Sequence, residues 1–181
     1  MADDRFIEPD TKDWTWVLTR ACPDCGFDAS TFDARAAGAA IRRVAAAWCD
    51  QLARADVASR PSPTVWSPLE YGCHVRDVLV IGQRRLGRML DEDDPLFENW
   101  DQDRTAVDED YGAQDPDRVQ DELAEVAAQL ARRFDEVGDE AWSRPGRRSD
   151  GARFTVDSFA RYLLHDPVHH LWDVGAAPVL H

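Results

Sequence analysis

Apolar residues recur at spacings of three and four along four stretches of the chain, and this period predicts four α-helices. The predicted helices span residues 33–58, 67–90, 115–138 and 155–175. The second has the best-marked start, because Ser67-Pro68-Leu69-Glu70 combines an N-cap serine, a proline at the first helical position and a glutamate at the third. No stretch with the strand period is long enough to compete. The pattern therefore predicts an all-α protein, a four-helix bundle with one core.

The connection between the second and third helices is unusually long. It takes about 24 residues, 91–114, which is enough to cross the length of a bundle instead of forming a tight hairpin. We therefore expect these two helices to run parallel. Ten acids and only one base, Arg104, occupy the connection, which favours a solvated loop. Its aromatic residues, Phe97, Trp100 and Tyr111, must nevertheless pack on something.

Length and charge bound the function. A chain of 181 residues favours one domain, divided here into an N-terminal extension (1–32), the bundle (33–175) and a short tail (176–181). A net charge of -14 repels a phosphate backbone, so we expect a small-molecule substrate and no nucleic acid. The acidic first ten residues lack an export signal, and no apolar run suits a membrane span. Four cysteines are too few for a disulfide scaffold, so we expect a cytoplasmic protein.

Histidines supply the candidate chemistry. His165 and His169 lie four apart on one face of the fourth helix, and His74 shares a face of the second helix with apolar residues. All three should point into the core, whereas His170 is rotated by about 100° from His169 and should point elsewhere. Three imidazoles converging from two helices could hold a metal ion with open positions for water or substrate. The alternative is that each is separately hydrogen-bonded at a helix packing seam.

At this point the sequence resembles a known family. Trp66-Ser67-Pro68-Leu69-Glu70, followed by His74-Val75-Arg76-Asp77 and, much later, by His165-Asp166-Pro167-Val168-His169-His170-Leu171, is similar to the DinB/YfiT-like family of metalloenzymes. The resemblance implies a bundle with up-down-down-up topology and a long crossover between its second and third helices. It also implies a zinc or nickel ion held by one histidine of the second helix and a His-x-x-x-His pair of the fourth. These ligands would be His74, His165 and His169.

The resemblance suggests a reaction class as well. Some relatives are thiol S-transferases that use bacillithiol or mycothiol, and the related maleylpyruvate isomerases use mycothiol. A metal with three neutral ligands could activate either a bound thiol or a bound water. We therefore expect a metal-dependent S-transferase with a mycothiol-type thiol, or a metal-assisted hydrolase. The alternative is a bundle that binds metal without catalysis, and a homodimer is plausible in each case.

Four further residues are candidates for the site. Arg147 and Arg148 belong to the one basic stretch of an acidic chain and could clamp an anionic cofactor, or they could pair with the acidic crossover. Glu70, four before His74, could orient its ring or act as a base, although its place in the capping box is a structural role. Tyr162, three before His165, could donate its hydroxyl to a substrate or simply pack.

Other residues near the histidines could support them. Asp77, Asp166 and Asp173 are close enough in sequence to fix the imidazole tautomers. Trp172, three after His169, is the best candidate among seven tryptophans for a wall of the pocket.

The N-terminal extension carries a separate motif. Cys22-Pro23-Asp24-Cys25-Gly26 resembles one half of a zinc knuckle, whose completion would need Cys49, Cys73, a histidine or another chain. A redox dithiol is a second interpretation, and two reduced thiols in a turn are a third.

Overall fold

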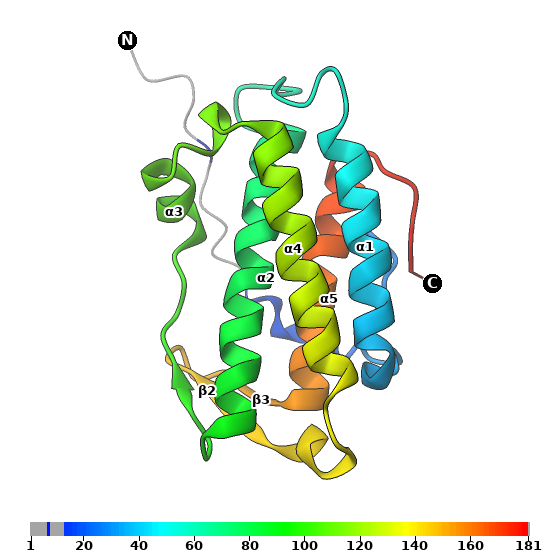
Figure 1. The fold of residues 1–181 in the computed structure, drawn as a ribbon, viewed down its shortest axis with the longest axis vertical. Helices are drawn as coiled ribbons and strands as arrows, with labels where there is room; N and C mark the ends of the chain where they lie inside the picture. The colour runs from blue at the N-terminus through cyan, green and yellow to red at the C-terminus, as the bar shows by residue number, and fades with distance from the viewer. Residues whose placement is uncertain (1–6, 8–12, 181) are drawn as a thin grey trace.

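Four long helices form the body of the protein. The computed structural model describes residue 7 and residues 13–180, so most of the acidic first ten residues and His181 lie outside the described residues. The helices are α1 (Ala37–Leu52), α2 (Pro68–Asp91), α4 (Pro116–Asp135) and α5 (Val156–Asp173). In Figure 1, α2 and α4 run in one direction and α1 and α5 in the other, with α1 and α2 each packed against α4 and α5. The predicted up-down-down-up bundle is confirmed.

The helix starts follow local hydrogen bonding. At α2 the Ser67 amide donates to Glu70 Oε2 over 2.8 Å, and the Glu70 amide donates to Ser67 Oγ over 3.3 Å, which is the predicted capping box. Asp115 caps α4 by accepting from two backbone amides of its first turn. These caps satisfy amides that the helices leave without a partner.

The crossover from α2 to α4 contains structure that the hydrophobic pattern does not predict. It includes the strand β1 (Leu96–Phe97), the short helix α3 (Gln102–Asp108) and the 3-10 turn η3 (Tyr111–Ala113). The remaining 3-10 turns are η1 (Trp14–Leu18), η2 (Ala34–Ala36) and η4 (Asp139–Ser143).

A small sheet closes one end of the bundle. Its order is β1-β2-β3, with β2 (Pro145–Arg148) parallel to β1 and antiparallel to β3 (Arg153–Thr155). Strands this short show no alternation of apolar and polar residues, so the sequence pattern cannot predict them. The sheet ties the start of the crossover to the segment that leads into α5 (Figure 1).

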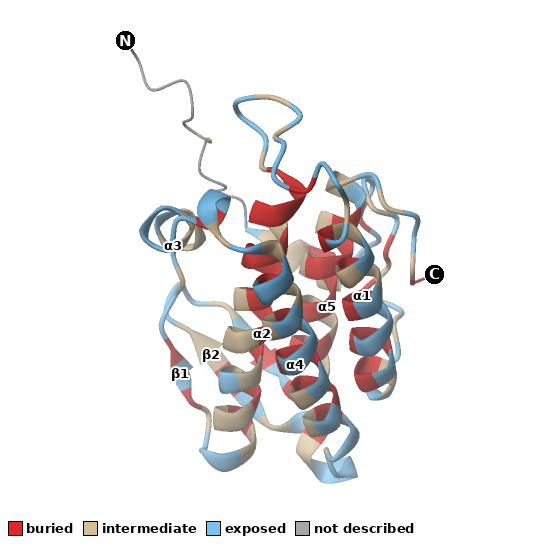
Figure 2. Ribbon diagram, turned by 45° about the horizontal axis from the view of Figure 1, so that its top comes forward, coloured by how far each residue is buried: buried red, intermediate tan, exposed pale blue. Residues whose placement is uncertain are grey.

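The core runs between the four helices. Buried segments alternate with exposed ones along each helix, as Figure 2 shows for α2 and α4. At Gly82 of α2, an added Cβ would lie 2.7 Å from a methyl group of Leu163, so the Leu163 side chain packs closely on the α2 backbone here. Within the described residues, no helix is both long and apolar enough for a membrane span.

Two features bear directly on α5. The helix continues without a break through Pro167, whose carbonyl oxygen accepts a hydrogen bond of 3.0 Å from the buried Trp48 indole. The N-terminal turn η1 packs on the same helix. The extension before α1 is thus part of the surroundings of the histidine helix.

Candidate metal sites

The three histidines predicted as ligands are all buried. His74 of α2 is 0% exposed, and His165 and His169 of α5 are 4% and 9% exposed. Spacing therefore predicted their direction into the core correctly. The structure does not, however, bring the three into one group of potential ligands. Among the described residues, side-chain atoms that could bind a metal and lie within 4.8 Å of one another form two groups. One group contains His74, and the other contains His165 and His169.

The first group contains His74, Asp166 and His170, and we call it the open site. Asp166 Oδ1 lies 3.3 Å from His74 Nε2 and 3.7 Å from His170 Nε2. Asp166 and His170 are four apart and so share a face of α5, one residue further along than His165 and His169. Sequence analysis considered Asp166 only as a supporting residue and His170 as pointing elsewhere. The spacing of 166 and 170 was the available signal.

Neighbouring side chains fix the open site. The Nδ1–H of His170 donates to Asp173 Oδ2 over 2.7 Å, which leaves the lone pair of His170 on Nε2. The Trp100 ring stacks on the His74 ring with centroids 5.4 Å apart and planes 10° apart. Of the predicted supporting aspartates, Asp166 and Asp173 therefore contact the histidines directly.

Two residues of the open site have polar atoms without a hydrogen bond. Both ring nitrogens of His74 and Asp166 Oδ1 are buried without a hydrogen bond. Such atoms cost free energy unless something satisfies them, and a divalent cation between two imidazoles and a carboxylate would satisfy one nitrogen of His74 and the oxygen of Asp166. Burial alone would raise the pKa of the Asp166 carboxyl, but the facing imidazoles of His74, His170 and His165 hold it below its usual range. The residues present therefore fit a bound metal ion.

The second group contains Cys22, Cys25, His165 and His169, and we call it the four-ligand site. Cys22 Sγ lies 3.5 Å from His169 Nδ1, and all four cysteines of the chain are free thiols. Burial lowers the pKa of His165 to about 4 and raises the pKa of the Cys25 thiol to about 12. Uncharged imidazoles at neutral pH are the form that binds metal.

A cavity of about 450 Å³ lies beside α5. Trp66, Tyr71 and Trp172 form part of its wall, and Asp166 and His170 of the open site line it. The prediction that Trp172 walls the pocket is confirmed. His74, which is fully buried, holds the far side of the open site. A ligand of small-molecule size can therefore reach the open site from the cavity.

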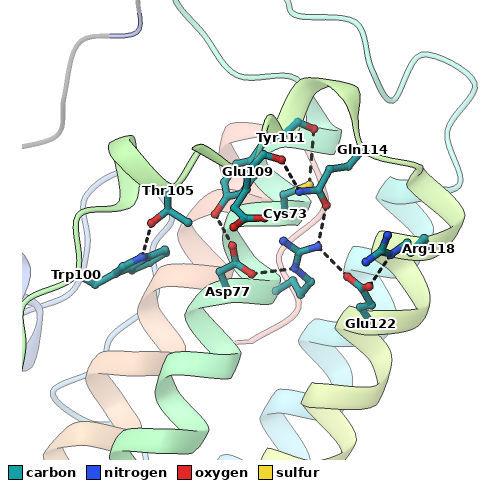
Figure 3. Close-up of polar contacts among 10 residues, drawn as sticks. Cys73, Asp77, Trp100, Thr105, Glu109, Tyr111, Gln114, Arg118 and Glu122 are labelled. Carbon is teal, nitrogen blue, oxygen red and sulfur yellow. Dashed lines mark hydrogen bonds and ion pairs between the residues drawn. The ribbon is translucent and has the colours of Figure 1, made fainter. Parts of the chain in front are cut away.

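A polar network anchors the crossover to α2 and α4 (Figure 3). The Tyr111 hydroxyl donates to Asp77 over 2.5 Å, and the Arg76 guanidinium donates to Asp77, Gln114 and Glu122 over 2.8 to 2.9 Å. Asp77 therefore holds the crossover onto α2 instead of contacting His74 as a supporting partner. This attachment fixes the far end of the segment that carries Trp100.

The two catalytic candidates lie in different surroundings. Glu70 is buried and receives hydrogen bonds from Ser67 and from the Arg60 guanidinium, which pairs with its carboxylate. Its hydrogen bonds with Ser67 are those of the predicted capping box. Tyr162 instead lines the cavity, and its hydroxyl accepts a hydrogen bond of 3.0 Å from Arg148.

The two arginine candidates separate as well. Arg147 pairs with Asp94 of the crossover at 2.9 Å, which is the loop-pairing alternative. Arg148 pairs with Asp150 at 2.7 Å and also lines a smaller hollow of about 100 Å³ that reaches Asp166 and Tyr162. Only Arg148 of the pair lies beside the open site.

Comparison with known proteins supplies a family and a fold. The model of the DinB superfamily matches residues 37–174. The solved structure of YfiT from Bacillus subtilis is similar with a TM-score of 0.67 and 15% sequence identity, and the match covers 78% of this chain and 87% of YfiT. YfiT is described as a probable metal-dependent hydrolase with an unusual four-helix bundle topology. No curated protein matches this chain.

Proposed function

The chain belongs to the DinB superfamily, and from this premise we propose that it is a metal-dependent hydrolase whose divalent cation is held by His74, Asp166 and His170. One observation carries the proposal: buried side-chain nitrogen and oxygen atoms of α2 and α5 that make no hydrogen bond converge beside a cavity of about 450 Å³. The description of YfiT as a probable metal-dependent hydrolase supports the same reaction class. This proposed ligand set differs from the three-histidine set expected from the family resemblance, which stays a prediction.

The donor types favour particular metals. Two imidazoles and one carboxylate are a known ligand set of catalytic zinc, and imidazole also suits nickel. Three protein ligands leave positions for water or substrate, and a cation so held lowers the pKa of a bound water and polarises a carbonyl oxygen. We therefore propose zinc or nickel at the open site.

The remaining residues of the site orient a ligand and line the cavity. Asp173 keeps the His170 ring in the tautomer that presents Nε2 to the site. Trp66 and Tyr71 form part of the cavity wall beside these groups. The Arg148 guanidinium holds the Tyr162 hydroxyl, which can donate a hydrogen bond to a substrate oxygen.

Thiol transfer is the second candidate, and Arg148 favours it. A mycothiol-type thiol carries polar groups that need donors near the metal, and Arg148 lines the hollow that adjoins Asp166. Its pairing with Asp150 weakens this interpretation, because the guanidinium is already partly neutralised. The cytoplasmic location and the homodimer stay part of the proposal as predictions.

Metal analysis and a turnover screen test the proposal together. We expect metal in the purified full chain, loss of that metal from the open site in His170→Ala, and hydrolysis of ester or amide substrates that needs no added thiol. Asp157→Asn is the matched control, since Asp157 also lies on α5 but pairs with Arg161. Turnover only with added thiol and electrophile would identify a transferase instead. Metal without turnover of either kind would leave a non-catalytic metal-binding bundle.

A further inference from the structure

The N-terminal extension brings two cysteines to the histidine helix. Cys22 and Cys25 lie about 140 residues before His165 and His169, yet one donor atom from each of the four lies within 4.8 Å of the others. Neither the family match, which starts at residue 37, nor the proposed hydrolase activity accounts for this meeting.

We propose that Cys22, Cys25, His165 and His169 form a closed, tetrahedral zinc site that fastens the N-terminal extension to α5. Two thiolates and two imidazoles are a common ligand set of structural zinc. Because the protein supplies all four ligands, no position remains for water or substrate. The proposal does not depend on the hydrolase activity.

Ligand spacing agrees with a tetrahedral ion. Zinc binds sulfur at about 2.3 Å and nitrogen at about 2.0 to 2.1 Å, so tetrahedral angles place a sulfur and a nitrogen ligand about 3.6 Å apart. Cys22 Sγ and His169 Nδ1 are 3.5 Å apart. The distance is thus close to the one that a shared zinc ion requires.

An unpaired polar atom points to the same ligand. His165 is 4% exposed, and its Nε2 is buried without a hydrogen bond. An imidazole nitrogen in that state is costly, and a zinc ion would satisfy it. This observation is independent of the cysteine motif.

The backbone of the Cys-x-x-Cys turn presents both sulfurs to α5. The Gly26 amide donates to the Cys22 carbonyl and the Cys22 amide donates to the Phe27 carbonyl, each over 3.0 Å. Gly26 has a φ of 74°, a backbone conformation that residues with a side chain rarely adopt. The turn of the predicted knuckle half is therefore formed, and two histidines of α5 complete it.

The zinc site would also position the open site. Its ligands His165 and His169 are each followed directly by a residue of the open site, Asp166 and His170. Binding of His165 and His169 to the extension would fix the rotation of α5 about its axis. This rotation directs Asp166 and His170 toward His74. Trp14 of η1 supports this attachment by packing on His165 and His169, with ring centroids 5.4 and 5.2 Å apart.

Zinc content of the full chain tests the proposal. We expect one equivalent to be lost from Cys22→Ser/Cys25→Ser and retained in His170→Ala, while the matched control Cys49→Ser keeps the content of the wild-type chain. Loss in His170→Ala alone would mean that only the open site binds metal. Unchanged zinc in the double cysteine variant would overturn the proposal, as would a Cys22–Cys25 disulfide found by mass spectrometry.

A second measurement uses the intact wild-type chain and so does not depend on the folding of a variant. Cobalt-loaded wild-type protein should show thiolate-to-cobalt charge transfer and the strong visible bands of a tetrahedral ion. His170→Ala should keep these bands, and a mercurial reagent that captures thiols should abolish them. Cobalt bound without a thiolate band would contradict the four-ligand site even if the hydrolase activity were found, so the two proposals can fail separately.

Discussion

The two groups of ligands on α5 differ in how many donors the protein supplies. His165 and His169 meet two cysteines of the extension, whereas Asp166 and His170 meet one histidine of α2. Four protein ligands close a metal site and suit it to holding structure, while three leave room for chemistry. The two proposals therefore give neighbouring residues of one helix different roles.

Removing the cysteines should have the largest effect. In a His170→Ala background, which isolates the four-ligand site, free zinc at about a thousand times its dissociation constant adds about 4 kcal/mol to the free energy of unfolding. At about 2 to 4 °C per kcal/mol, Cys22→Ser/Cys25→Ser should lower the melting temperature by about 8 to 16 °C. Thermal unfolding with and without a zinc chelator measures this. If the chelator lowered the melting temperature of the cysteine variant by the same amount, the stabilising zinc would not be bound by the cysteines.

Much of this arrangement could be predicted from the sequence, because it follows from local rules. The capping box of Ser67 and Glu70 depends on residues three apart, and the shared face of His165 and His169 depends on residues four apart. The length of the crossover likewise predicted the parallel course of α2 and α4. Each prediction needs only the geometry of one helix or the reach of one loop.

The division of the histidines could not be predicted in this way. Residues 165 and 166 differ by about 100° in direction, so the rotation of α5 about its axis decides which pair faces His74. That rotation depends on packing, such as the close approach at Gly82 and the contact between η1 and α5. The short strands and α3 were missed because segments of two to seven residues carry no period.

Loss of the carboxylate should affect the open site alone. Asp166→Asn removes the only anionic donor of the group, and we expect metal affinity and any hydrolysis to fall by at least about 100-fold, since even outer partners of a metal ligand are worth about 10- to 100-fold. Metal titration should find the four-ligand site unchanged, with Asp157→Asn as control. An equal loss from both sites would show that they are coupled and not separate.

Glu70→Gln should separate a structural carboxylate from a catalytic one. Burial alone would raise the pKa of Glu70, but hydrogen bonds from Arg60 and Ser67 lower it overall. Its carboxylate therefore adds stability above the unfolded pKa of about 4.3 and loses it as the pH falls through the lower folded value. We expect about 2 kcal/mol of destabilisation at pH 7, and a smaller difference near pH 3, by urea unfolding. Lost turnover with unchanged stability would instead make Glu70 a catalytic residue.

The smallest effect should come from the partner of one ligand. Asp173 Oδ2 accepts from His170 Nδ1 at 2.7 Å but lies 4.0 Å from His169 Nε2, so it supports the open site more directly than the four-ligand site. Asp173→Asn should weaken metal binding at the open site by about 10-fold, because the His170 ring loses the carboxylate that fixes its tautomer. Competition with a chelating dye measures that change. A larger loss of affinity at the four-ligand site than at the open site would contradict this prediction. The hydrogen bond from His170 to Asp173 would then not set the metal affinity of the open site, and the two sites would differ in their ligands alone.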